Sequence, residues 1–128
     1  MDNVFIEGVG STTFGQHSNR TAVDLAVEAS LNAIEDAKVD LEKIGTVYLG
    51  NFVSGVLTGQ EVLAGLVADK LGISGVPATK VEGACASGGM AFRHACMAVA
   101  SGSCEVALAV GVETVSYTHL TLPTTSSV

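Results

Sequence analysis

Apolar residues follow two patterns along the chain: short continuous runs, and longer stretches in which they recur at helical spacing. The short runs are bounded by glycine or polar residues, and they predict strands over residues 3–9, 46–52, 77–83 and 105–113. The longer stretches predict helices over residues 22–37, 60–71 and 85–100. Between them, the segment GVLTG at residues 55–59 is predicted to be a loop.

Two of the predicted helices carry end signals. Thr21 can cap the helix over 22–37, and Asp24 adds a favourable negative charge near the amino end of that helix. Gly72 directly follows the helix over 60–71, a position where glycine commonly ends a helix.

The order of these elements predicts the fold class. A strand followed by a helix occurs three times before the last strand, as in α/β proteins. Continuous apolar strands joined by helices indicate a mostly parallel sheet with helices on both faces and right-handed crossovers. The 128 residues are 48% apolar and 15% charged, which suits about one well-buried domain.

The last 14 residues, VSYTHLTLPTTSSV, differ from the rest because they contain no Lys, Arg, Asp or Glu. Their first part also resembles one translated frame of the adapter used in transposon-based short-read library preparation. We therefore expect an incomplete domain over residues 1–114 and a non-native tail over residues 115–128, which is left out of the fold prediction.

Charge and composition exclude several classes of function. The net charge is −7 and the six Lys and Arg are scattered, whereas nucleic-acid binding needs a basic stripe. The amino end lacks a secretory signal, and no apolar run is long enough to span a membrane. Three cysteines without a close pair suggest neither a disulfide framework nor a zinc site. We expect a cytoplasmic protein without metal, membrane or nucleic-acid partner.

The segment KVEGACASGGMAF places Cys85 among small residues at a predicted strand-to-helix junction. Free backbone N–H groups at a helix start favour negative charge, so a thiol in the first turn there is activated as a nucleophile. Gly83, Gly88 and Gly89 would leave room for a substrate. The alternative from position alone is a small buried apolar cysteine. A hydrolase elbow does not fit, because the pattern is not G-x-S-x-G.

The segments VEGACASGGMAF and AVASGSCEVALAVGVET are similar to the nucleophile region of the thiolases, closest to the archaeal-type members. The opening VFIEGVGSTTFG and the strand VYLGN also resemble the amino-terminal half of that family, so the resemblance covers nearly all of residues 3–114. It implies a thiolase-like amino-terminal half of the α/β class, with a truncated sheet.

The resemblance also implies a reaction. Cys85 would attack an acyl-CoA thioester, and its backbone N–H would supply half of an oxyanion hole. The acyl group would then pass to a second acyl-CoA, or CoA would cleave a 3-ketoacyl-CoA in reverse. Acetyl-CoA C-acetyltransferase chemistry is the reaction we expect, with CoA thioesters as substrates, no cofactor, and a homodimer or homotetramer as the full-length assembly.

Two groups of this reaction have no counterpart here. In the family, a histidine activates the thiolate and a second cysteine moves the α-proton, and both come from the carboxyl-terminal half. We therefore expect the chain to be a fragment that is not catalytically competent alone. The alternatives are a ketoacyl synthase of the same superfamily, which decarboxylates an extender, and a non-catalytic binding or scaffold subunit.

The remaining candidate residues are predicted to be structural. Cys96 lies three helical turns beyond Cys85, about 16 Å along a straight helix, which excludes a disulfide or a close catalytic pair. We expect Cys96 and Cys104 to be core residues. His94 falls on the helix face opposite Cys85 and is expected to be structural or at a subunit interface. His17 is predicted to be solvated, Glu82 to be solvated or hydrogen-bonded, and His119 lies in the tail.

Overall fold

The computed structural model describes residues 3–114. The predicted tail, 115–128, therefore lies outside the described residues, and the domain boundary stays a prediction. In chain order the elements are α1 (Ala22–Ala37), the 3-10 turn η1 (Leu41–Lys43), β1 (Ile44–Gly50), α2 (Ser54–Thr58), α3 (Leu63–Leu71), β2 (Ala78–Val81), α4 (Ser87–Ala100) and β3 (Val106–Gly111).

The three strands form one parallel sheet in the order β2-β1-β3. The register pairs Gly50 at the end of β1 with Val81 of β2 and with Gly111 of β3. The carboxyl ends of all three strands therefore meet at one edge of the sheet, and the predicted parallel α/β architecture is confirmed.

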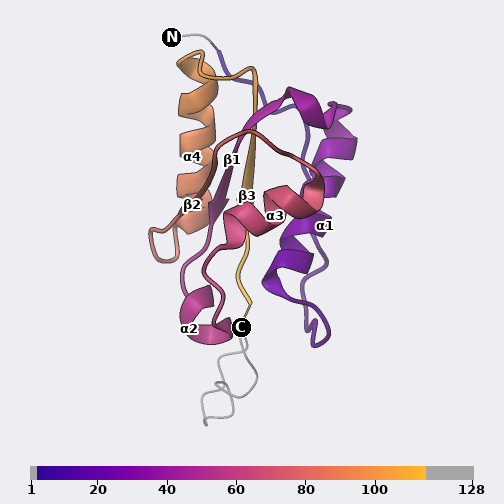
Figure 1. Cartoon of the computed structure of the whole chain (residues 1–128), viewed down its shortest axis with the longest axis vertical. Helices are drawn as coiled ribbons and strands as arrows, with labels where there is room; N and C mark the ends of the chain where they lie inside the picture. The colour runs from indigo at the N-terminus through magenta and orange to yellow at the C-terminus, as the bar shows by residue number, and fades with distance from the viewer. Residues whose placement is uncertain (1–2, 115–128) are drawn as a thin grey trace.

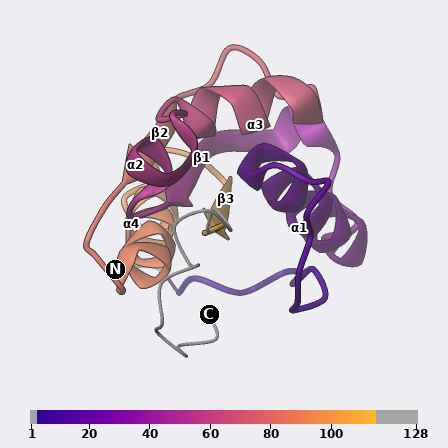
Figure 2. The ribbon, with the colours of Figure 1, turned by 90° about the horizontal axis from the view of Figure 1, so that it is seen from below.

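Helices cover both faces of the sheet, as predicted (Figure 1). Val47 and Leu49 of β1 are fully buried in an aliphatic core with residues of α1 and α3. Tyr48, between them, points to the opposite face, because alternate strand residues do so, and its ring lies 5.5 Å from that of His94 on α4. Figure 2 shows α4 and α1 on opposite sides of β3.

The end signals of α1 and α3 are confirmed. Thr21 Oγ1 accepts from the Asp24 N–H at 3.1 Å, while Asp24 Oδ2 accepts from the Thr21 N–H at 2.9 Å, a reciprocal capping box. Gly72 ends α3 in the left-handed conformation, with φ 82°. The start of α3 is three residues later than predicted, because the Gln60 side chain accepts from the Val62 N–H in a turn.

The prediction of a buried strand over residues 3–9 was wrong. The segment is extended but unpaired, Phe5 is 73% exposed, and β3 pairs directly with β1. The glycines of this region hold it against α1 instead, since a Cβ on Gly8 would lie 2.5 Å from the Ala33 carbonyl oxygen. The Val9 N–H donates to Asp36 Oδ2 of α1 at 2.9 Å, whereas in a strand it would donate to the backbone of a neighbouring strand.

The prediction of a loop over residues 55–59 was also wrong, because Ser54–Thr58 forms the short helix α2. Asn51 Oδ1 accepts from the Ser54 N–H at 3.1 Å, and Gly59 ends the turn with φ 77°. One helical turn is too short to produce a recognisable apolar period. Among the described residues, no helix is long and apolar enough to cross a membrane.

Candidate functional site

The turn between β2 and α4 holds the sequence-predicted nucleophile, Cys85. The turn follows β2 and so lies at the carboxyl edge of the sheet, and Figure 1 shows it at the same end of the sheet as α2. Such edges of parallel sheets are where α/β proteins usually place their sites. Cys85 is exposed and is a free thiol, so the alternative of a small buried apolar cysteine is wrong.

The helix begins two residues later than predicted, at Ser87 rather than Cys85. Cys85 and Ala86 instead belong to a turn that contains Ala84, whose φ of 53° lies in the left-handed region. The Ala86 N–H donates to the Gly83 carbonyl at 3.0 Å, and the Ser87 N–H donates to the Ala84 carbonyl at 3.2 Å. Cys85 therefore lies at the apex of a tight turn in front of the helix.

Two side chains close this turn. The Gly83 N–H donates to Ser87 Oγ at 2.9 Å, and the Ser87 O–H donates to the Ala84 carbonyl at 2.6 Å. Glu82 Oε2 accepts from the Ala84 N–H at 2.6 Å. The prediction that Glu82 is hydrogen-bonded is confirmed, whereas the sequence analysis missed the part played by Ser87.

The start of α4 is favourable for negative charge. Its N-cap residue, Ala86, has no capping side chain. Among the described residues, no acceptor takes a hydrogen bond from the N–H of Gly88 or Gly89, and both residues are exposed. These two amides, together with the helix dipole, can stabilise an anion held at the start of α4.

Glycines bring this helix start onto the strand ends. A Cβ on Gly50 would clash with the Ser87 carbonyl and lie 2.7 Å from the Gly88 nitrogen, and one on Gly111 would lie 3.3 Å from the Gly88 Cα. Gly50 must therefore remain glycine for α4 to approach the end of β1 this closely, whereas a side chain at Gly111 would require α4 to shift by a few tenths of an ångström. Sequence reasoning overlooked Gly50 and Gly111, although each ends an apolar run.

The three glycines near Cys85 that were predicted to leave room for a substrate differ in their surroundings. A Cβ on Gly83 would overlap Met90 Sδ, so this glycine accommodates a side chain of α4. Gly88 lies against Gly111, as described above. Only Gly89 faces open space.

The hydrogen-bonded pair Asn51 and Glu113 connects the segments that follow β1 and β3 at the same edge of the sheet. The sequence analysis did not predict this pair. Asn51 is 1% exposed, and its Nδ2 donates to the Val112 carbonyl at 2.8 Å and to Glu113 Oε2 at 2.9 Å. Glu113 Oε1 in turn accepts from the Phe52 N–H at 2.9 Å. The available signal was the position of Asn51 directly after β1 and of Glu113 two residues after β3, at the ends of paired parallel strands.

The other sequence candidates lie elsewhere. The His94 ring lies against that of Tyr48 at a tilt of 43°, and its Nδ1 bonds to the Met90 carbonyl at 2.7 Å, which agrees with the predicted structural role. His17 Nε2 bonds to the Thr13 carbonyl at 2.7 Å. Cys96 and Cys104 are partly buried rather than fully in the core, and burial raises the pKa of the Cys104 thiol.

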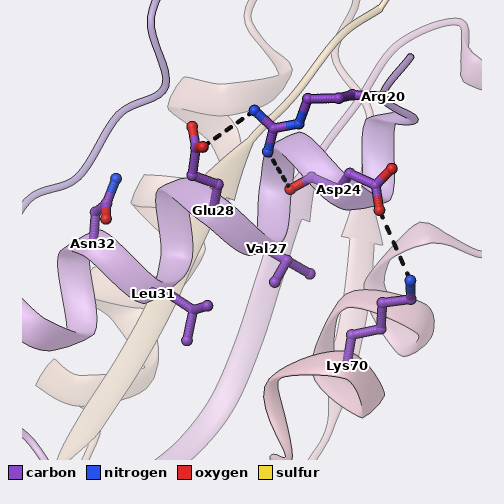
Figure 3. A pocket seen from close by; sticks show the side chains of 7 residues that line it. All are labelled: Arg20, Asp24, Val27, Glu28, Leu31, Asn32 and Lys70. Carbon is purple, nitrogen blue, oxygen red and sulfur yellow. Dashed lines mark hydrogen bonds and ion pairs between the residues drawn. The ribbon is translucent and has the colours of Figure 1, made fainter.

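Two open grooves lie away from Cys85. One, of about 540 Å³, runs along α1 beside α3, where Arg20 pairs with Glu28 at 3.1 Å and Lys70 pairs with Asp24 at 3.8 Å (Figure 3). The other, of about 510 Å³, lies between α4 and β1, lined in part by Tyr48 and His94. Neither is lined by Cys85.

Comparison with known proteins identifies the family. The model of the thiolase amino-terminal domain matches residues 4–127. An acetyl-CoA acetyltransferase of Methanocaldococcus jannaschii is 44% identical over 113 residues, which cover 88% of this chain and 29% of that protein. The chain thus spans less than a third of the length of this relative.

Solved structures agree on the fold. Human mitochondrial 3-ketoacyl-CoA thiolase in complex with CoA matches with a TM-score of 0.71 at 26% identity, over 78% of this chain and 26% of that one. The 3-oxoacyl-(acyl-carrier-protein) synthase III of Aquifex aeolicus matches with a TM-score of 0.60 at 23% identity, over 68% and 28% of the two chains. The chain belongs to the thiolase family, whose amino-terminal domain it matches over nearly its whole length.

Proposed function

We propose that this chain carries the acyl-accepting cysteine of an acetyl-CoA acetyltransferase, and that Cys85 is that residue. One observation supports this most directly: Cys85 is an exposed free thiol at the apex of the turn that opens α4, a helix whose Gly88 and Gly89 amides have no acceptor among the described residues. The 44% identity to an acetyl-CoA acetyltransferase indicates the substrate class.

The first half-reaction follows from this arrangement. The Cys85 thiolate attacks the thioester carbonyl carbon of acetyl-CoA, and the C–S bond to CoA then breaks. The CoA thiolate leaves and takes up a proton, while the acetyl group remains on Cys85 as a new thioester. Negative charge develops on the carbonyl oxygen during attack, and backbone N–H groups fixed at the helix start stabilise it.

In the second half-reaction, the carbanion of a second acetyl-CoA attacks the acetyl-cysteine carbonyl, releasing acetoacetyl-CoA and the Cys85 thiolate. The described residues place neither His17 nor His94 in a bond with Cys85, so the groups that move the protons are not assigned to this part of the chain. CoA thioesters are the proposed ligands, without a further cofactor. A homodimer or homotetramer in the cytoplasm remains a prediction.

A ketoacyl synthase has the same fold, and the match to the Aquifex synthase shows that architecture does not separate the two. The synthase decarboxylates its extender, whereas a thiolase removes an α-proton from acetyl-CoA. The identity to an acetyl-CoA acetyltransferase favours the thiolase.

The proposal is tested by incubating the chain with acetyl-CoA and measuring its mass and the modified peptide. We expect one acetyl group on the peptide that contains Cys85, and none on the Cys85→Ala variant. The Cys96→Ala and Cys104→Ala variants are matched controls that should be acetylated like the unsubstituted chain. Equal acetylation of the Cys85→Ala variant would refute the assignment.

A further inference from the structure

The Ser87 hydroxyl is the only side-chain group of the described residues that bonds to two backbone positions of the Cys85 turn. It accepts from the Gly83 N–H at 2.9 Å and donates to the Ala84 carbonyl at 2.6 Å. Ser87 is 4% exposed, so water competes little for either bond. Both partners lie on the amino-terminal side of Cys85, whereas Ser87 itself is the first residue of α4.

This hydroxyl supports a backbone conformation that is unfavourable on its own. Ala84 has φ 53°, which a residue with a Cβ rarely adopts, and such conformations persist only where surrounding contacts hold them. The Glu82 carboxylate also bonds to Ala84, but Glu82 is exposed and its bond faces solvent. The buried Ser87 hydroxyl is therefore the stronger constraint on the turn.

The conformation of Ala84 fixes where Cys85 points. A return of Ala84 to right-handed backbone would rotate the peptide plane that follows it and redirect the Cys85 side chain relative to the Gly88 and Gly89 amides. Ser87 is itself held in place, because its carbonyl packs against Gly50 at the end of β1. The sheet edge, the helix start and the thiol are thus connected through one hydroxyl.

We infer that Ser87 is a positioning residue for the acyl-accepting thiol: its hydroxyl holds the left-handed turn at Ala84 and so fixes the position of Cys85 in front of α4. This inference rests on the proposed function. Ser87 does not contact the substrate in this role, so it should affect the rate of acyl transfer to Cys85 and not the affinity for acetyl-CoA.

The test compares Ser87→Ala with the unsubstituted chain. The rate of acetylation by acetyl-CoA and the rate of alkylation by iodoacetamide are measured separately for each cysteine, by peptide mass, across a range of pH. We expect the maximal acetylation rate of Cys85 to fall about tenfold, because small misplacements of a reacting group are costly. The acetyl-CoA concentration for half-maximal rate and the alkylation rates of Cys96 and Cys104 should not change.

Ser101→Ala is the matched control, since Ser101 also bonds to a backbone carbonyl, that of Ala98 at 3.1 Å, but at the far end of α4. In the Ser101→Ala variant, Cys85 should be acetylated at the same rate as in the unsubstituted chain. A Ser87→Ala variant that folds and acetylates Cys85 at the unsubstituted rate would overturn the inference alone. If Cys85 of the unsubstituted chain reacts no faster than Cys96, both the inference and the proposed function are overturned.

A Ser87→Ala variant that unfolds is recognised because Cys96 and Cys104 then react faster as well. The pair Ser87→Thr and Ser87→Val decides that case, because the two side chains share a shape and differ in the hydroxyl. Fast acetylation of Cys85 in Ser87→Thr with slow acetylation in Ser87→Val supports the inference. Equal rates in the two variants overturn it.

Discussion

At the scale of single residues, the capping box of α1 gives the clearest dependence on pH. The backbone N–H of Thr21, followed by its side chain, holds the pKa of Asp24 below its usual value of 3.8. Because the folded state lowers this pKa, Asp24 stabilises the fold above pH 3.8, and this contribution is lost as the pH falls below that value.

We expect Asp24→Asn to lower the free energy of unfolding at neutral pH, because the charged side chain at the helix start is lost. The difference from the unsubstituted chain should shrink as the pH falls below 3.8. Urea unfolding followed by circular dichroism at several pH values measures it. Asp40→Asn is the control, since Asp40 precedes η1 without capping it by a side-chain bond. A difference that stays constant down to acid pH would contradict this role of Asp24.

Single residues also show which features of the structure could be predicted from the sequence. Thr21, Asp24 and Gly72 mark helix ends through local bonds, so these ends were predictable. The role of Ser87 was not predictable, because its two bonds depend on the left-handed backbone at Ala84. Alanine has no preference for that conformation, so the sequence gives no signal of it. The extended segment containing Gly8 was mistaken for a strand, because its close packing on α1 leaves no periodic signal.

At the scale of elements, the approach of α4 to the ends of β1 and β3 places the site. The sequence predicted a parallel sheet and a strand-to-helix junction at Cys85, and in a parallel sheet such a junction lies at the carboxyl edge. The closeness of the approach depends on Gly50 and Gly111, and their importance appears only when the helix start is seen against them.

We expect Gly50→Ala to destabilise the fold by about 1–3 kcal/mol, because the added methyl group meets the backbone of Ser87 and Gly88, which cannot move aside cheaply. It should also slow the reaction of Cys85. Thermal unfolding and Cys85 alkylation rates test both effects.

Gly65→Ala is the matched control for that substitution. A Cβ there meets only Val62 at 3.9 Å, on the exposed face of α3, and alanine favours helix over glycine by about 1 kcal/mol. Gly65→Ala should therefore stabilise the fold slightly. Equal stability of the Gly50→Ala and Gly65→Ala variants would show that the close approach does not matter.

At the scale of the whole molecule, the fold and the thiolase family are shown, and the reaction of Cys85 is a proposal. The chain spans 29% of the acetyl-CoA acetyltransferase it matches. His94, the histidine of α4, is engaged with Tyr48 and Met90, so the described residues offer Cys85 no obvious proton carrier.

We therefore expect the 128-residue chain to accept an acetyl group from acetyl-CoA without cleaving acetoacetyl-CoA catalytically. Single-turnover acetylation and steady-state cleavage can be compared on the same preparation. Sustained cleavage of acetoacetyl-CoA that is abolished by Cys85→Ala would contradict this expectation and show that the chain holds every group it needs.

The most direct measurement is site-resolved labelling of the three cysteines by a haloacetyl-CoA, with and without competing CoA. If Cys85 accepts acyl groups, it should be labelled well before Cys96 and Cys104, and CoA should slow its labelling selectively. Labelling of Cys85 no faster than that of Cys96, and indifferent to CoA, would contradict the assignment of Cys85 as the nucleophile.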